Sequence, residues 1–275
     1  MVSNIGNRLR AVENIKKITT SMEMVSSARL RKAQIKARQG QFYIAKIEEI
    51  LERLERASTE YKHPFFEQRE PKKALLVLVS SDKGLCGSYN TRVFSQADRF
   101  IKSNAFESVE LMLLGRKAQQ YYQRKKYQIA EGSREISTID VKELSDRLIK
   151  SFLENEADVI WLIYTKFYNL MQREVVTEKF LPIGKPKSEK ATSLNYILEP
   201  NLEEIYSHLL ERFCMTKIRS MLSQSYASEL AARIFAMKTA STNAEEMLQD
   251  LTLEHNKMRQ AGITREILET TGSAG

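Results

Sequence analysis

The sequence predicts a mixed α/β protein in which both ends of the chain form a long antiparallel coiled coil around an inserted α/β domain. Three observations lead to this prediction. Residues 201–261 contain neither proline nor glycine, a second apolar stripe follows the N-terminus, and strand-like and helix-like segments alternate between the two. Because proline and glycine are the residues that most often end a helix, residues 201–261 are expected to form a single one.

Apolar side chains recur every seven residues along this C-terminal segment, which is typical of a coiled-coil seam. The series comprises Leu230, Met237, Ala244, Leu251 and Met258, with Ile234 and Leu248 at the half-heptad positions. At 1.5 Å per residue an unbroken helix over residues 201–261 would run roughly 90 Å. A compact domain of this chain's size has a radius of gyration of only roughly 19 Å. We therefore expect the helix to extend beyond its own domain and to be covered by something else.

The N-terminal segment predicts the second helix, from about Ser3 to about Ser58, since no proline occurs before Pro64. Gly40 lies inside it and is expected to weaken it locally by about 1 kcal/mol. Apolar side chains follow one another at spacings of three or four residues: Ile5, Leu9, Val12, Ile15, Ile18, Met22 and Val25. We expect this stripe to be the seam that faces the C-terminal helix.

The central part of the chain reads as an α/β domain. Its first strand, Ala74–Val79, is a continuous apolar run, as expected for a strand buried on both faces of a parallel sheet. The further segments predicted are a helix at Thr91–Ser103, a strand at Val109–Leu114, a helix at Arg116–Arg124, a helix at Val141–Leu153, strands at Val159–Tyr164 and Arg173–Leu181, and a short segment at Leu194–Leu198. This order indicates an α/β architecture.

Charge is unevenly distributed along the chain. The total of 43 basic against 35 acidic side chains gives +8 and indicates an acidic partner. Within residues 1–40 only Glu13 and Glu23 oppose a basic set: Arg8, Arg10, Lys16, Lys17, Arg29, Arg31, Lys32, Lys36 and Arg38. Residues 1–41 contain no aromatic side chain that could stack on nucleic acid or anchor in a membrane interface. An acidic protein partner fits better, and a solvated charged face is the alternative.

The remaining composition gives no indication of a cofactor, a metal site or a membrane span. Cys86 and Cys214 lack the spacing of a disulfide framework or zinc site, and the three histidines are far apart in sequence. No run of about 18 apolar residues occurs. Two isolated cysteines favour a reducing cytosol. The amphipathic pattern starts close to Met1, so we expect no signal peptide.

The turn after the first strand, Ser80 to Gly87, occupies the place where an open α/β sheet would bind a ligand. It lacks the glycine spacing of either phosphate-binding loop, so its glycines are expected to serve the turn. Ser80 and Lys83 have the S-x-x-K spacing of an acyl-transfer enzyme, but the partner motifs S-D-N and K-T-G are absent. A hydrolase using Ser81 or Cys86 is the weakest alternative.

Three motifs, in order along the chain, resemble the gamma subunit of bacterial F-type ATP synthases. The first runs from Lys17-Ile18-Thr19 through Met22-Glu23-Met24-Val25 to Arg29-Leu30-Arg31-Lys32-Ala33-Gln34. The second is Ser81-Asp82-Lys83-Gly84-Leu85-Cys86-Gly87. The third spans Ser228-Glu229, Ala231-Ala232-Arg233, Ala236-Met237-Lys238-Thr239-Ala240, Asn243-Ala244, Asn256-Lys257, Arg259-Gln260-Ala261 and Ile263-Thr264.

The resemblance implies a non-catalytic rotor with no cofactor and no active site of its own. Residues 1–60 and 200–275 would form the shaft inside a hexamer of alpha and beta subunits, and residues 72–199 a Rossmann-like α/β domain. That domain would contact the epsilon subunit and the ring of c subunits, so that proton-driven rotation is coupled to ATP synthesis or hydrolysis. The chain would be peripheral, at the cytoplasmic face of the plasma membrane, touching the membrane only indirectly and no nucleic acid.

The resemblance also implies which residues contact the catalytic subunits. Those on the N-terminal helix are Met22, Arg29, Arg31 and Lys32, and those on the C-terminal helix are Arg233, Arg259, Gln260 and Thr264. The alternative to the rotor is a coiled-coil scaffold that binds another acidic protein or nucleic acid.

Overall fold

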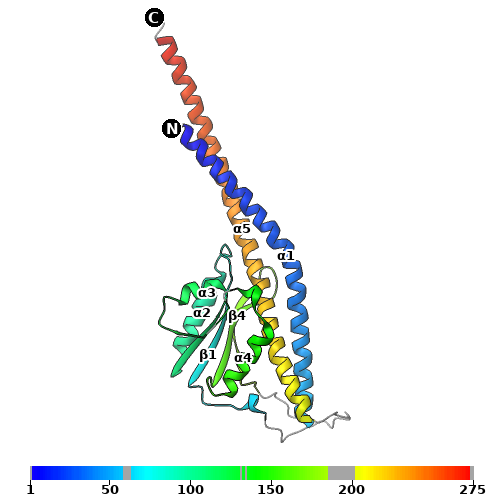
Figure 1. Cartoon of the computed structure of the whole chain (residues 1–275). Coiled ribbons are helices and arrows are strands. Elements are labelled where there is room, and N and C mark those ends of the chain that lie inside the picture. Colours follow the sequence, from blue (N-terminus) through cyan, green and yellow to red (C-terminus); the bar gives the residue numbers. More distant parts are fainter. Residues whose placement is uncertain (1, 58–62, 131, 134, 185–201, 273–275) are drawn as a thin grey trace. The chain divides into compact units, whose positions relative to one another are not determined.

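The computed structural model describes residues 2–57, 63–130, 132, 133, 135–184 and 202–272. The chain divides into two compact units. The coil unit comprises Met1–Ala28 and Arg233–Gly275, and the sheet unit comprises Arg29–Ala232. Helix α1 (Val2–Ala57) and helix α5 (Leu202–Gly272) each contribute to both units (Figure 1).

In the coil unit the two terminal helices pack antiparallel along the predicted C-terminal seam. The buried side chains are Ile5, Val12, Ala244 and Leu251, with Leu9, Leu248 and Met258 packed against them. At the edge of this seam the hydroxyls of Thr20 and Ser241 lie 3.0 Å apart, and Lys16 pairs with Glu245. The predicted heptad series of α5 is thus confirmed within this unit, and so is the expectation that the two ends of the chain pair.

Beyond Val12 the predicted seam of α1 is wrong at Ile15, Ile18 and Val25, and only Met22 is half-buried. Ile15, Ile18 and Val25 are 51%, 59% and 51% exposed, whereas Thr19 and Ser26 are buried. Each residue advances about 100° around a helix, so two successive three-residue steps, from 12 to 15 and from 15 to 18, turn the stripe by about 120° away from the seam. The buried positions instead follow a seven-residue repeat from Ile5, in which small polar residues replace apolar ones.

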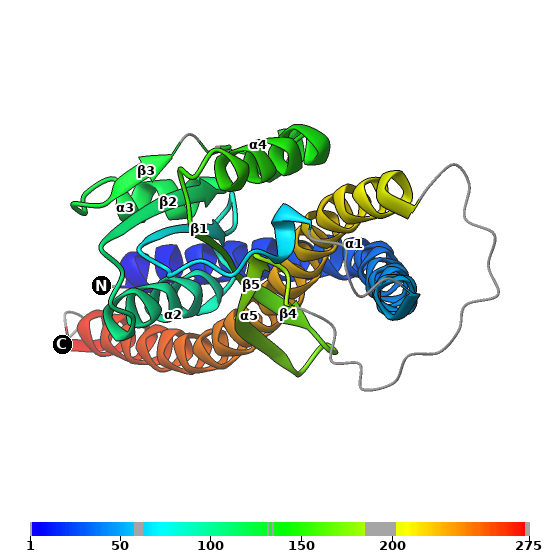
Figure 2. The same cartoon turned by 90° about the horizontal axis from the view of Figure 1, so that it is seen from below.

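The sheet unit contains a five-stranded sheet in the order β3-β2-β1-β4-β5. Its strands are β1 (Lys73–Val79), β2 (Ser108–Leu114), β3 (Gln128–Ala130), β4 (Val159–Phe167) and β5 (Arg173–Leu181). The first four are mutually parallel, and β5 pairs antiparallel with β4 at one edge (Figure 2). This mostly parallel arrangement confirms the predicted Rossmann-like architecture. The sequence did not predict the short strand β3.

The helices of the sheet unit lie close to their predicted positions. They are α2 (Tyr89–Ser103), α3 (Arg116–Tyr122) and α4 (Val141–Leu153), with short 3₁₀ turns at Pro64–Phe66 and Ile136–Thr138. Helix α4 begins where the carboxylate of Asp140 accepts hydrogen bonds from the backbone N–H groups of Lys142 (2.8 Å) and Glu143 (3.3 Å). Such a cap satisfies donors that the first turn leaves free. The segment predicted at Leu194–Leu198 lies outside the described residues.

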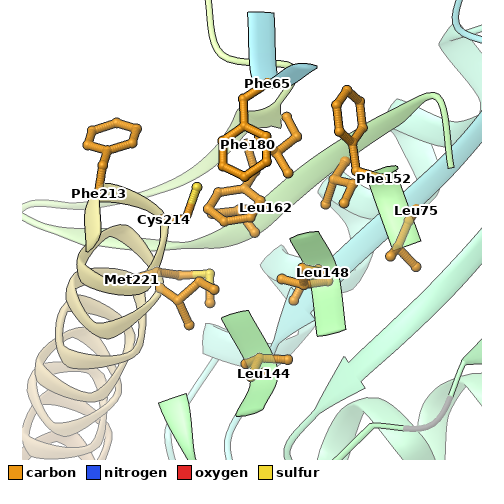
Figure 3. Close-up of a cluster of buried hydrophobic side chains, with 14 of the residues drawn as sticks. Phe65, Leu75, Leu144, Leu148, Phe152, Leu162, Phe180, Phe213, Cys214 and Met221 are labelled. Carbon is orange, nitrogen blue, oxygen red and sulfur yellow. The ribbon is translucent and has the colours of Figure 1, made fainter. Parts of the chain in front are cut away.

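Side chains of β1 alternate between two apolar cores, one on each face of the sheet. Leu76 and Leu78 pack with side chains of α2 and α3, including Val93 and Ala118. Leu75, Val77 and Val79 face the other way and join the larger core (Figure 3). Three helices complete this core: α1 with Ile47 and Leu51, α4 with Leu144, Leu148 and Phe152, and α5 with Leu210, Cys214, Ile218 and Met221. Strand β1 is therefore buried on both faces, as its apolar run predicted.

Helices α1 and α5 also approach each other closely inside the sheet unit, at Gly40. A Cβ added at Gly40 would lie 3.1 Å from Oγ and 3.2 Å from Cβ of Ser220. Helix α1 continues through this glycine. Its missing side chain thus allows a close contact between the helices. The domain boundaries placed at residues 60, 72 and 200 stay predictions.

Candidate partner-binding surface

Polar side chains of the turn that follows β1, Ser80 to Gly87 (the central turn), form hydrogen bonds within the fold. Ser80 is fully buried; its Oγ accepts a hydrogen bond from the Ala118 N–H (2.8 Å) and lies 3.2 Å from the Leu114 carbonyl oxygen. Ser81 is also fully buried, and its N–H donates to Oδ1 of Asn90 (3.0 Å). These serines stabilise the turn and have no exposed hydroxyl for acyl transfer.

Asp82 and Cys86 are likewise used inside the fold. The carboxylate of Asp82 accepts hydrogen bonds from the backbone N–H groups of Ile136 (3.1 Å) and Arg116 (3.4 Å), which join the turn to two later segments. The Cys86 side chain is 2% exposed and lies 3.4 Å from the amide nitrogen of Asn90. The turn therefore has the features of a structural element, and its geometry gives no support to the hydrolase alternative.

Large apolar side chains are exposed on the coil unit. On α1 they are Ile15, Ile18, Met24 and Val25, and on α5 they are Met247, Leu253, Ile263, Ile267 and Leu268. The last three follow Met258, the final residue of α5 in the seam cluster. Large apolar side chains exposed in such number usually mark a binding site for another protein.

Helix α1 also exposes basic side chains at the start of its part in the sheet unit. Arg29, Arg31 and Lys32 are exposed, and none of them forms an ion pair with another described residue. Only two of the basic residues before them have such a partner: Lys17 lies 3.0 Å from Glu13, and Lys16 pairs with Glu245. Unpaired cations on one helix leave a surface that favours an acidic partner.

The structure places the predicted contact residues in different environments. Six of them are exposed: Arg29, Arg31, Lys32, Arg259, Gln260 and Thr264. Met22 is half-buried. The hydroxyl of Thr264 donates to the carbonyl oxygen of Gln260 (2.9 Å), within the same helix. Arg233 is only 8% exposed, so it offers a partner very little surface. Sequence reasoning missed the exposed Ile15, Ile18 and Met24.

The described residues hold no cluster of potential metal ligands, and none of their helices is long and apolar enough to cross a bilayer.

Comparison with known proteins places the chain in a family. A family model described as ATP synthase matches residues 1–275. The ATP synthase gamma chain of Protochlamydia amoebophila is 47% identical over 276 residues, covering 98% of this chain and 96% of the relative. That of Moorella thermoacetica is 36% identical, with coverage of 98% and 97%.

This chain belongs to the ATP synthase gamma-chain family. Gamma chains are non-catalytic subunits, which agrees with the internally bonded turn. Solved structures show that the fold is shared as well. A chain of the Euglena gracilis mitochondrial ATP synthase superposes with a TM-score of 0.67 over 99% of this chain and 93% of that one, at 16% identity. A chain from the structure of the central stalk and c-ring of the Tetrahymena thermophila mitochondrial ATP synthase gives a TM-score of 0.59 over 82% of this chain and 99% of that one, at 23% identity.

Proposed function

We propose that this chain is the central shaft of a proton-translocating F-type ATP synthase. Membership of the gamma-chain family supports the role. The chain contributes no catalytic group; it transmits rotation between a membrane ring of c subunits and a hexamer of alpha and beta subunits. The complex is associated with a membrane, and we place the chain at its cytoplasmic face.

The observation that carries this proposal is the exposed apolar surface of the coil unit. Nine large apolar side chains, four on α1 and five on α5, are about half exposed or more: Ile15, Ile18, Met24, Val25, Met247, Leu253, Ile263, Ile267 and Leu268. A free two-stranded coil would expose charged residues instead, because exposed apolar area is unfavourable at about 25 cal/mol per Å². A surrounding sleeve of partner subunits removes that cost and explains why the surface includes both helices.

The exposed basic residues extend the proposal to a contact with the catalytic subunits. Arg29, Arg31 and Lys32 would meet an acidic segment of those subunits, and Met22 would pack beside it. Arg259, Gln260 and Thr264 would make polar contacts near the end of α5. Because an asymmetric shaft presents a different face to each surrounding subunit, it would stabilise a different conformation in each. The α/β domain would contact the epsilon subunit and the c ring.

Purification of the native complex tests the function. A tag inserted after Gly184 leaves both ends of the chain free, and membranes are solubilised before capture. We expect nucleotide-binding subunits in excess over this chain, with ATP hydrolysis that the isolated chain lacks. Recovery of the chain alone, or with nucleic acid, would overturn the proposal in favour of the scaffold alternative.

Charge reversal tests the proposed contact. Replacing both Arg29→Glu and Lys32→Glu should reduce ATP hydrolysis coupled to proton pumping, since the partner surface is acidic. The matched control is Arg124→Glu with Lys126→Glu, which makes the same change in charge at exposed positions between α3 and β3. Equal losses in both variants would show that net charge, and not this contact, is responsible.

Truncation after Met258 should weaken assembly while leaving the α/β domain folded.

A further inference from the structure

The contact between α5 and the rest of the sheet unit changes character along the helix. From Leu210 to Leu222, α5 contributes apolar side chains to the larger core (Figure 3). The next turns of α5 still bury Ala227 and Leu230, but they also bury four polar side chains: Gln224 (4% exposed), Ser225 (1%), Ser228 (fully buried) and Glu229 (6%). We call these four residues the polar layer.

Two buried hydrogen bonds join the polar layer to two separate elements of the α/β domain. The hydroxyl of Tyr89, the first residue of α2, donates to the backbone carbonyl of Ser225 (3.2 Å). The hydroxyl of Ser228 donates to the backbone carbonyl of Thr165 in β4 (3.0 Å). Ser225 and Ser228 are three residues apart and so lie on one face of α5. A single turn of the helix is therefore attached at two points.

Both hydrogen bonds are well suited to a permanent attachment. Tyr89 is 5% exposed, and burial, together with the nearby Glu229 carboxylate, raises its pKa, so that the phenol keeps its proton and remains a donor. Thr165 is 4% exposed, so water cannot easily replace its bond with Ser228. Hydrogen bonds in such surroundings are sensitive to geometry, because breaking one leaves a buried polar atom without a partner.

The polar layer is a poor solution for stability alone. The side-chain oxygen Oε1 of Gln224 and the Oγ of Ser225 are buried without a hydrogen-bond partner among the described residues. An apolar layer of similar shape would avoid that cost. Apolar contacts are non-directional, however, so an apolar layer alone would specify the angle of the helix less sharply. Directional bonds resist a change in that angle, which is the role that buried polar groups serve where they specify one arrangement.

We propose that Tyr89 and Ser228 are positioning residues that lock α5 against rotation relative to the α/β domain, and so pass torque from that domain to the shaft helix. This inference rests on the proposed function, because torque arises only in a rotating complex. The larger apolar core, to which α5 contributes from Leu210 to Leu222, holds α5 to the sheet. The two hydrogen bonds fix the angle at which it is held.

The test compares hydrolysis with proton pumping in the assembled complex. Tyr89→Phe removes only a hydroxyl, and Ser228→Ala removes the second donor. Each variant and the pair are reconstituted in vesicles, and ATP hydrolysis and ATP-driven proton uptake are measured together. We expect the double variant to lose proton uptake per ATP hydrolysed, with each single variant intermediate. Matched controls on the same stretch of α5 are Tyr226→Phe, at a position 38% exposed, and Ser223→Ala, at a half-buried position.

A merely structural role would lower the thermal stability of the isolated chain and the yield of complex, but would leave proton uptake per ATP unchanged in the complexes that form. That unchanged ratio would overturn the inference while leaving the proposed function in place. If complexes containing the unaltered chain hydrolyse ATP but take up no protons, the proposed function itself fails.

Discussion

Gly40→Ala measures how closely α1 and α5 approach in the sheet unit. Alanine is a better helix former than glycine by about 1 kcal/mol, so the substitution should be stabilising wherever there is space for the methyl group. At Gly40 the added Cβ would lie 3.1 Å from Oγ and 3.2 Å from Cβ of Ser220, both closer than ordinary van der Waals contact. Overpacking of this kind typically costs about 1–3 kcal/mol. We expect the free energy of unfolding to be unchanged or lowered by up to about 2 kcal/mol.

The matched control is Gly6→Ala, on the same helix in the coil unit, where an added Cβ meets no atom within 4 Å. This variant should gain up to about 1 kcal/mol, and the two should differ by about 1–3 kcal/mol in urea unfolding followed by circular dichroism. Adding Ser220→Gly to Gly40→Ala removes the obstructing side chain, so the two effects should not be additive. Equal stabilisation by both alanines, with an additive double variant, would refute the close approach.

Three further predictions concern the seam, a thiol and the central turn. Ile18→Asp should change the stability of the isolated chain by less than about 0.5 kcal/mol yet impair assembly with the partner subunits, whereas Val12→Asp should melt the coil; thermal unfolding and size-exclusion chromatography distinguish them. Burial raises the pKa of Cys214 to about 12, so its alkylation at neutral pH, followed by mass spectrometry, should require unfolding; rapid labelling of the native chain would contradict its burial. Asp82→Ala should destabilise the sheet unit by about 1–3 kcal/mol in urea unfolding, because the Ile136 N–H loses its acceptor. An unchanged midpoint of the unfolding curve would show that the hydrogen bonds of Asp82 do not stabilise the fold.

The strands were predictable because their residue types leave few alternatives. The continuous apolar run of β1 can be satisfied only by burial on both faces, and the order of helices and strands followed from where such runs occur. Strand β3 was missed because it has three residues and is mostly exposed, so it has neither the length nor the apolar pattern that sequence reasoning depends on.

The seam of α1 shows why apolar spacing alone misleads. Thr19 and Ser26 are buried at heptad positions, while the neighbouring Ile15 and Ile18 are exposed. A strict count of seven from Ile5 would have found the buried positions, but it requires accepting small polar residues in a seam. The partner contacts could not be derived from residue patterns, because they depend on surfaces of other subunits. The low exposure of Arg233 could have been predicted from its position, since it follows Leu230 by three residues and therefore lies beside the seam.

The central claim is that this chain rotates as the shaft of its complex. Both native cysteines are buried, so a thiol introduced by Lys102→Cys at an exposed position of α2 can carry a rotational probe. The purified hexamer with this chain is fixed to a surface, and the probe is observed while ATP is supplied. The account predicts continuous rotation in one direction that stops when ATP is removed. Steady ATP hydrolysis with a probe that stays at one angle would contradict it.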